Sequence, residues 1–202
     1  MNKTIQYFLA PHSPWTYLGH ARFVALAQAA GAHVDIKPFD LGKVFGASGV
    51  LPLAKRAPQR QAYRLLELAR WSDQLGLPLN PQPTFFPIPP DAAAKLIIAA
   101  RTSLGCDAAL EVAGAVMRAL WAEDKNIADD DTLAHITNGC GFDGRMLVKS
   151  AHTAGVQEQY ERNTDEAMAA NVFGAPWYGV DGVGFWGQDR LDFVARALAK
   201  AA

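Results

Sequence analysis

The sequence has 202 residues, 50% of them hydrophobic and 19% charged, which is the composition of a globular protein with a sizeable core. The formal net charge of −1, from 19 Lys and Arg against 20 Asp and Glu, argues against a nucleic acid or a membrane as partner. Because the chain also lacks a signal-like apolar segment and any run of about 18 apolar residues, we expect a cytoplasmic protein.

The N-terminal part has the pattern of a strand, a helix and a second strand. Residues 4–9 and 34–38 are rich in β-branched and aromatic residues. Between them, Ser13 has N-cap chemistry, Pro14 takes the first helical position, and Gly31 ends the helix. The apolar positions that we expect on its buried face are Leu18, Ala21, Ala25 and Ala29. A strand–helix–strand unit of this length predicts two parallel strands with a right-handed crossover.

From residue 41 the pattern changes to loop and helix. A helix is predicted over residues 56–75, and six of the 12 prolines then fall in the stiff, irregular segment 78–90. Four further helices are predicted at residues 91–104, around 110–121, at 129–139 and at 143–152. We therefore expect residues 41–150 to form an inserted helical domain.

The α/β pattern returns after this insertion. A helix ends near Asn171, and strands at 176–180 and 183–186 flank an Asp-Gly turn, which predicts a β-hairpin. The last helix begins around Asp189, with Leu191, Val194, Ala195 and Leu198 as its buried positions. Residues 1–40 and 151–202 are thus predicted to form one α/β domain.

Ser13 is the first candidate site residue. A hydroxyl at a helix start lies beside free backbone N–H groups, where the helix dipole favours an anion or a thiolate. An ordinary N-cap serine explains the position equally well, and the two roles are compatible.

Two segments near the C-terminus are further candidates. Pro176 stands at the beginning of a strand, where a proline either starts the strand or forms a cis bond. Gly187 allows the backbone to approach a ligand closely, and Asp189 with the following helix start could receive the amino and carboxylate groups of an amino acid. A plain capping aspartate is the alternative for Asp189.

A basic stripe is the fourth candidate. Arg56, Arg60 and Arg64 are spaced to share one helix face, with Lys55 beside them. Such a stripe is usually solvated, but Lys55 and Arg56 could receive a carboxylate substrate if this face overhangs the site, with Phe85 and Phe86 as aromatic walls. Arg60 and Arg64, farther along the helix, are expected to be solvated.

The sequence indicates neither a redox-active cysteine pair nor a metal site. Cys106 and Cys140 do not form a C-x-x-C motif and are expected to be reduced thiols in the core. His135 with Cys140 is too sparse for a zinc site, so no metal is expected.

Three motifs, in this order and spacing, carry a family resemblance. They are Ser13-Pro-Trp-Thr-Tyr-Leu18, Val172-Phe-Gly-Ala-Pro176 and Phe185-Trp-Gly-Gln-Asp-Arg-Leu191. Together they resemble the 2-hydroxychromene-2-carboxylate isomerase family, which is related to kappa-class glutathione transferases and DsbA-like proteins. The resemblance covers essentially the whole chain. It implies an α/β, thioredoxin-like (DsbA/kappa-type) fold with an inserted all-helical domain, a homodimer, and glutathione as cofactor.

The resemblance also implies roles for individual residues. Ser13 would hold the glutathione thiolate, Ala175 and the cis-proline Pro176 would pair with its cysteinyl segment, and Gly187, Gln188 and Asp189 would form the γ-glutamyl pocket. The implied reaction is a cis–trans isomerisation of a ring-opened aromatic carboxylate to trans-o-hydroxybenzylidenepyruvate, by addition of the thiolate, bond rotation and elimination.

The chain departs from the family pattern at two places. It has Ala10 where an Asp is frequent, and it reads Phe45-Gly-Ala-Ser-Gly-Val50 where many members read Phe-Lys-Ala-Thr-Gly-Asn. Lys43, Lys55 or Arg56 could replace the missing lysine. Two alternative functions therefore stay open: a glutathione transferase acting on another electrophile, and a non-catalytic thioredoxin-like protein that binds glutathione.

Overall fold

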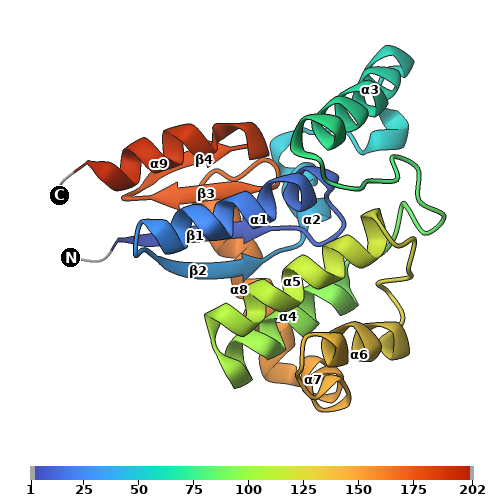
Figure 1. Cartoon of the computed structure of the whole chain (residues 1–202), viewed down its shortest axis with the longest axis vertical. Helices are drawn as coiled ribbons and strands as arrows, with labels where there is room; N and C mark the ends of the chain where they lie inside the picture. The colour runs from blue at the N-terminus through green and yellow to red at the C-terminus, as the bar shows by residue number, and fades with distance from the viewer. Residues whose placement is uncertain (1–2, 201–202) are drawn as a thin grey trace.

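The computed structural model describes residues 3–200, which contain a four-stranded mixed sheet with helices on both faces (Figure 1). The strands are β1 (Thr4–Leu9), β2 (His33–Pro38), β3 (Trp177–Val180) and β4 (Val183–Trp186), in the order β2-β1-β3-β4. β1 and β2 are parallel, whereas β3 is antiparallel to both β1 and β4. The predicted parallel pair and hairpin are therefore confirmed.

Alternation along β1 distributes its side chains between two helical layers. Tyr7 packs on Phe23 of α1 (Pro14–Ala29), with ring centroids 4.3 Å apart. The next residue, Phe8, belongs to a separate buried cluster with Ala167 of α8 (Ala154–Ala169). Because successive strand residues face opposite sides, α1 and α8 cover opposite faces of the sheet (Figure 1).

The predicted buried face of α1 is wrong in part. Leu18 is buried, but Ala21, Ala25 and Ala29 are exposed, and the residues that pack inward include Tyr17, Phe23 and Ala27. Alanine contributes little apolar surface, so its spacing did not determine which side of the helix is buried. Phenylalanine and tyrosine, with far larger side chains, decide the orientation.

The segment after β2 contains a helix that the sequence did not predict. α2 (Leu41–Ser48) begins at Asp40, whose carboxylate accepts a hydrogen bond from the Lys43 amide at 3.0 Å. After a short 3-10 turn, η1 (Leu53–Lys55), α3 spans Pro58–Leu75. Arg56 therefore lies outside α3, and the predicted stripe of three arginines on one helix face is wrong at its first member.

The remaining helices agree with the prediction to within a few residues. They are α4 (Asp91–Leu104), α5 (Cys106–Trp121), α6 (Asp130–Gly139), α7 (Gly144–Ala151), α8 and α9 (Leu191–Ala199), the last preceded by a 3-10 turn, η2 (Gln188–Arg190). In α9, Leu191 and Val194 are buried and Leu198 is half-buried as expected, but Ala195 is exposed.

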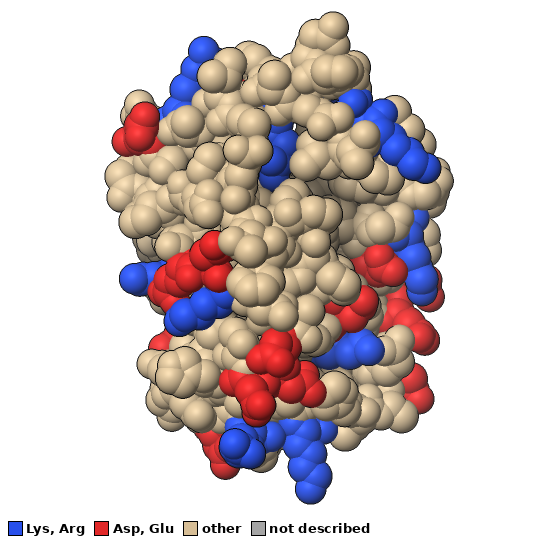
Figure 2. All heavy atoms as spheres, turned by 90° about the vertical axis from the view of Figure 1, so that its right-hand side faces the viewer, with Lys and Arg blue, Asp and Glu red and all other residues tan. Residues whose placement is uncertain are grey.

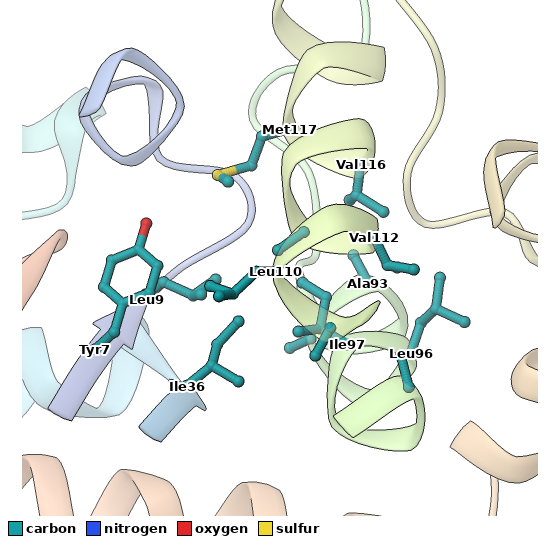
Figure 3. Close-up of a cluster of buried hydrophobic side chains, with 14 of the residues drawn as sticks. Tyr7, Leu9, Ile36, Ala93, Leu96, Ile97, Leu110, Val112, Val116 and Met117 are labelled. Carbon is teal, nitrogen blue, oxygen red and sulfur yellow. The ribbon is translucent and has the colours of Figure 1, made fainter. Parts of the chain in front are cut away.

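One buried cluster continues from the sheet into the helical part. Figure 3 shows side chains of the strands, such as Tyr7, Leu9 and Ile36, facing Leu110 and Met117 of α5. All of these side chains are at most 7% exposed. The two predicted domains thus pack on each other through a shared apolar layer, which fixes the helical part relative to β1 and α1.

A buried polar chain crosses the same interface. The Nε2 atom of His20 donates to the carbonyl oxygen of Leu110 at 2.9 Å, and the Tyr7 hydroxyl lies 3.1 Å from Nδ1. A carbonyl can only accept, so Nε2 carries the proton and Nδ1 accepts from Tyr7. Burial lowers the pKa of His20 to about 4, although its hydrogen bond to Leu110 acts in the opposite direction. His20 is therefore neutral at neutral pH.

The two ends of the described chain meet at Lys3. Its Nζ atom donates to the Asp181 carboxylate at 3.0 Å and to the carbonyl oxygen of Ala197 at 2.9 Å. This amine connects the start of β1 to the hairpin turn and to α9. Within residues 3–200, no helix has the length and hydropathy needed to cross a membrane.

Candidate functional site

Ser13 lies in the turn between the C-terminal end of β1 and α1. It is the N-cap residue of α1: its Oγ accepts a hydrogen bond from the Thr16 amide at 3.2 Å. The same Oγ donates to the carbonyl oxygen of Ala175 at 3.3 Å, and the residue is 5% exposed. The N-cap interpretation is confirmed, and the hydroxyl also lies at the positive end of the helix dipole, where negative charge is stabilised.

The segment before β3 faces Ser13. The Ala175–Pro176 peptide bond is cis, in agreement with the prediction. While the Ala175 carbonyl accepts from Ser13, the Ala175 amide has no hydrogen-bond acceptor among residues 3–200. An unpaired N–H at the end of a strand is a natural partner for the backbone of an extended ligand.

Gly187 extends this arrangement toward α9. Its amide donates to the carbonyl oxygen of Pro176 at 3.0 Å, and its φ of 110° is a conformation that favours glycine. A Cβ atom at this position would lie 2.6 Å from Oδ1 of Asp189. The Asp189 carboxylate therefore lies directly beside Gly187, and a larger residue would displace it.

Asp189 does not cap the last helix, so the alternative of a plain capping aspartate is wrong. Residues 188–190 form a 3-10 turn that leads into α9, whose N-cap is Arg190 without a side-chain cap. The Asp189 carboxylate is instead 38% exposed and pairs with the neighbouring Arg190 at 3.0 Å. It is accessible to a cationic group of a ligand.

Gln188 points inward rather than toward a ligand. It is 2% exposed, and both its carbonyl oxygen and its side-chain oxygen accept hydrogen bonds from Arg22 of α1. Its contribution to a binding site is limited to its backbone amide. The side chain instead holds the start of η2 against α1.

Ser13, Ala175, Pro176, Gly187 and Asp189 thus form a connected set of residues, which we call the cofactor strip after the role predicted for it. Hydrogen bonds connect Ser13 to Ala175 and Pro176 to Gly187, and Asp189 lies beside Gly187. The sequence prediction placed these residues in one site although more than 160 positions separate Ser13 from Ala175. The structure brings them together.

Two buried polar groups outside the predicted set of site residues are near the same two carboxylates, those of Asp40 and Asp91. The Nδ1 atom of His12 and the hydroxyl of Tyr160 are both buried and have no hydrogen-bond partner among the described residues. Burial lowers the pKa of His12 to about 4, whereas the Asp91 and Asp40 carboxylates act in the opposite direction. His12 is therefore neutral at neutral pH. A lone histidine beside a strand end carries no sequence signal that would have revealed this burial.

The predicted substrate residues lie on the helical part, with unequal exposure. Lys55 is exposed, and no ion pair or side-chain hydrogen bond involves it among residues 3–200. Arg56 is half-buried, donates from Nε to the Leu51 carbonyl at 2.8 Å and lies 5.8 Å from the ring centroid of Phe45. Phe85 is 38% exposed, and the inward-facing ring of this pair is Phe86, which packs on Trp121.

Arg64 was expected to be solvated, and this is wrong. The side chain is half-buried, with its guanidinium over the Phe86 ring at 5.3 Å and the Trp121 ring at 5.9 Å. Helical spacing placed it correctly one turn beyond Arg60, which is exposed. The spacing could not show that the proline-rich segment folds back over this part of α3.

The cysteines lie away from the cofactor strip. Cys106 begins α5 and Cys140 follows α6, both half-buried, so the expected position in the core is only partly correct. Burial raises the pKa of the Cys140 thiol, and the charge of Glu111 adds to this effect. A cavity between α4, α6 and α7 contains none of the predicted site residues. Within residues 3–200, no three potential metal ligands cluster together.

Comparison with known proteins agrees with this geometry. The chain matches the DSBA-like thioredoxin domain over residues 4–199. It is 27% identical over 199 residues to a 2-hydroxychromene-2-carboxylate isomerase of Sphingobium xenophagum, covering 98% of this chain and 99% of that protein. It is 26% identical to glutathione S-transferase kappa 2 of Caenorhabditis elegans, covering 98% and 92%.

The solved structure of a 2-hydroxychromene-2-carboxylate isomerase has a TM-score of 0.78 and 25% identity, covering 96% of this chain and 94% of that one. The resemblance seen in the sequence and the predicted thioredoxin-like, DsbA-type fold are both confirmed. Relatives that align along nearly the whole chain are enzymes by name, and the isomerases among them match the expected activity class. The chain belongs to the DSBA-like thioredoxin domain family.

Proposed function

We propose that the protein is a glutathione-dependent isomerase of aromatic catabolites of the 2-hydroxychromene-2-carboxylate type. The observation that carries this proposal is Ser13, a buried hydroxyl at a helix start, hydrogen-bonded to the cis-proline segment. The chain that holds it aligns over 98% of its length with an isomerase of that name.

The cofactor strip fits a γ-glutamyl peptide. The unpaired amide of Ala175 can receive a carbonyl of the cysteinyl segment. The exposed Asp189 carboxylate can receive the α-amino group. Glutathione, when bound, supplies a thiolate able to add reversibly to an unsaturated carbon.

Ser13 stabilises negative charge at the sulfur position. Its Oγ already accepts from the Thr16 amide, so its own proton is free to be donated. In this structure that proton is directed to the Ala175 carbonyl through a long, 3.3 Å contact. Redirecting it to a thiolate replaces a neutral hydrogen bond with a charge-assisted one, which is roughly twice as strong.

The same residue disfavours disulfide exchange at this position. Exchange requires a sulfur nucleophile, and Ser13 carries a hydroxyl. Cys106 and Cys140 lie on α5 and at the end of α6, outside the cofactor strip. The sulfur for the reaction would therefore come from the bound tripeptide.

The direct test follows the isomerisation of 2-hydroxychromene-2-carboxylate by absorbance, with and without glutathione. Turnover is expected only with glutathione, and S-methylglutathione, which lacks a free thiol, should inhibit competitively. Turnover at the same rate without any thiol, or no turnover with saturating glutathione, would reject the proposal.

A second candidate is a glutathione transferase acting on another electrophile. The match to a kappa-class transferase favours it, as does the altered segment 45–50, which forms the end of α2 and lies next to Arg56. An isomerase leaves the glutathione concentration unchanged, whereas a transferase consumes one molecule for each turnover. Thiol titration during the reaction therefore separates the two. A thermal shift with glutathione but no turnover of any electrophile would indicate a binding protein.

The cytoplasmic location and the homodimer remain predictions. So do the individual roles of Lys55, Arg56 and Phe85 in substrate binding. Size-exclusion chromatography with light scattering would test the dimer.

A further inference from the structure

Arg64 is a half-buried cation enclosed by aromatic rings. Its guanidinium lies over Phe86 and Trp121, whose ring centroids are 5.0 Å apart, and Trp121 is fully buried. Figure 2 shows the side of the molecule that carries α3 and the proline-rich segment. In its upper half a basic side chain is recessed in a hollow among uncharged atoms, while acidic side chains gather lower down.

No acidic partner neutralises this cation. Among residues 3–200, no carboxylate lies within ion-pairing distance of Arg56 or Arg64. Glu67, near Arg64 in the sequence, is already paired with Arg70. Glu123, near Trp121 in the sequence, is already paired with Arg118 and Lys125. A half-buried charge without a partner is costly, and a functional reason for retaining it is an anion supplied by a ligand.

Arg56 increases this requirement for an anion. Burial and, second, the positive charge of Arg56 lower the pKa of Arg64 to about 10, so both groups stay cationic at neutral pH. Arg56 itself lies over the ring of Phe45. We call Phe45, Arg56, Arg64 and Phe86 the arginine pocket. It combines positive charge with aromatic surface, the two features that an aromatic carboxylate requires.

Contacts connect the arginine pocket to Ser13. Phe45 packs on a buried cluster that includes Ala10 and Ala175. The Ala10 carbonyl accepts from the Ser13 amide at 2.9 Å, and the Ala175 carbonyl accepts from the Ser13 hydroxyl. From the opposite side, the Tyr17 hydroxyl of α1 donates at 2.7 Å to the carbonyl of Pro78, where the proline-rich segment begins. Phe45 thus shares a buried cluster with Ala10 and Ala175, the two residues whose carbonyls accept hydrogen bonds from Ser13.

We propose that Arg64 binds the carboxylate of the aromatic substrate, with Arg56 as the second cation and Phe45 and Phe86 as the walls beside the ring. The proposal rests on the proposed function and names the residue that selects its substrate class. Arg64 replaces Lys55 as the principal cation. A guanidinium offers a planar pair of donors that match both carboxylate oxygens.

The test measures the binding of two probes by calorimetry, trans-cinnamate and its uncharged analogue trans-cinnamamide. Wild type is expected to bind cinnamate about 10- to 100-fold more tightly than cinnamamide, and added salt should reduce this preference. Arg64→Gln should abolish the preference with little effect on cinnamamide. Arg64→Lys keeps the positive charge but lacks the planar pair of guanidinium donors, so it should retain part of the preference for cinnamate.

Arg60→Gln is the matched control, because Arg60 is exposed one turn away on the same helix and should leave both affinities unchanged. Equal affinities of wild type for the two probes, or the same loss in Arg60→Gln as in Arg64→Gln, would overturn the proposal. If Arg64→Gln fails to fold, Arg64→Lys and the salt dependence of wild type still decide. Glutathione binding is measured separately and tests the proposed function. The proposal for Arg64 and the proposed function can therefore fail independently.

Discussion

The cofactor strip and the arginine pocket are held in place by different means. The Ser13 hydroxyl donates to the Ala175 carbonyl, and the Gly187 amide donates to the Pro176 carbonyl, so hydrogen bonds to backbone carbonyls hold the strip together. The pocket instead depends on side chains from four segments. Phe45 belongs to α2, Arg56 precedes α3, Phe86 lies in the irregular proline-rich segment, and Arg64 belongs to α3, a helix with one buried residue, Leu68. The positions of the strip residues are therefore fixed by hydrogen bonds, whereas those of the pocket residues depend on side-chain packing.

The departures from the family pattern fall on both sites, but unequally. Segment 45–50, which includes Phe45 of the pocket, is altered at three positions, whereas the departure beside the strip is Ala10, three residues before Ser13. Loops and exposed helix faces can change residue type without disturbing a core, and substrate preference can change with them. A shared cofactor and a divergent substrate are the expected outcome, and the following measurements test this division.

The largest effect is expected for Ser13→Ala. Loss of the hydroxyl should lower turnover by about 10- to 1000-fold, because it removes charge stabilisation at the thiolate, while loss of the cap costs about 1 kcal/mol of stability. Asp129→Ala is the matched control, since Asp129 caps α6 by accepting from the Thr132 amide at 2.8 Å, away from the strip. Unchanged turnover in Ser13→Ala, with only a lower melting point, would leave Ser13 as a cap alone.

The interface between the two parts should weaken in acid. His20 has a pKa of about 4 when folded but about 6.5 when unfolded, so between these values only the unfolded chain binds the proton. The free energy of unfolding should therefore decrease as pH falls from 6.5 to 4, by about 3 kcal/mol from this group. Urea denaturation at several pH values measures this dependence.

His20→Gln should be less stable at pH 7 and should show a smaller pH dependence than wild type. His135→Gln, which changes an exposed residue of α6, is the control and should keep the wild-type slope. An identical slope in His20→Gln and wild type would mean that His20 does not account for the acid sensitivity.

Asp189→Asn should weaken glutathione binding by about tenfold through loss of one charge-assisted contact. Turnover at saturating glutathione should change little, because Asp189 lies away from the thiol position. Asp192→Asn, which removes an exposed carboxylate from the first turn of α9, provides the comparison. Calorimetry that returns equal dissociation constants for wild type and Asp189→Asn would remove Asp189 from the cofactor strip.

The smallest effect is expected for Lys55→Gln. An exposed amine with no fixed partner should raise the Michaelis constant for a carboxylate substrate only about twofold, less than Arg56→Gln. Steady-state kinetics with both variants ranks the two cations. A larger effect for Lys55 than for Arg56 would place the substrate outside the arginine pocket.

Most secondary structure was predictable because local signals agree with the fold. Gly76 ends α3 with a φ of 59°, and the Asp181-Gly182 turn has positive φ at both residues, as a tight hairpin requires. α2 was missed because Gly42 and Gly46 lower its helix propensity. It forms because Asp40 caps it and because Leu41 and Val44 pack on Phe8 and Phe39. Such tertiary contacts are absent from a local pattern.

The cofactor strip was predictable because its residues occur in short motifs at element boundaries. The arginine pocket was not, because its geometry depends on how residues 78–90 return to α3. The spacing of Arg60 and Arg64 places both residues on the same helix face and does not indicate which of them is buried. Only the positions of Phe86 and Trp121 distinguish them, since they cover the second residue and leave the first exposed.

The contacts of Lys3 have a consequence for chain connectivity. Because its amine holds Asp181 and the Ala197 carbonyl, the described ends of the chain lie beside each other. A short glycine linker could therefore join them, and new ends could be opened at Gly141, an exposed residue between α6 and α7. In such a circular permutant the inserted helices would be divided between the two ends of the polypeptide, while Ser13, Ala175 and Gly187 would keep their neighbours. The order in which the segments are synthesised is thus separable from the architecture that brings Ser13, Ala175 and Gly187 together.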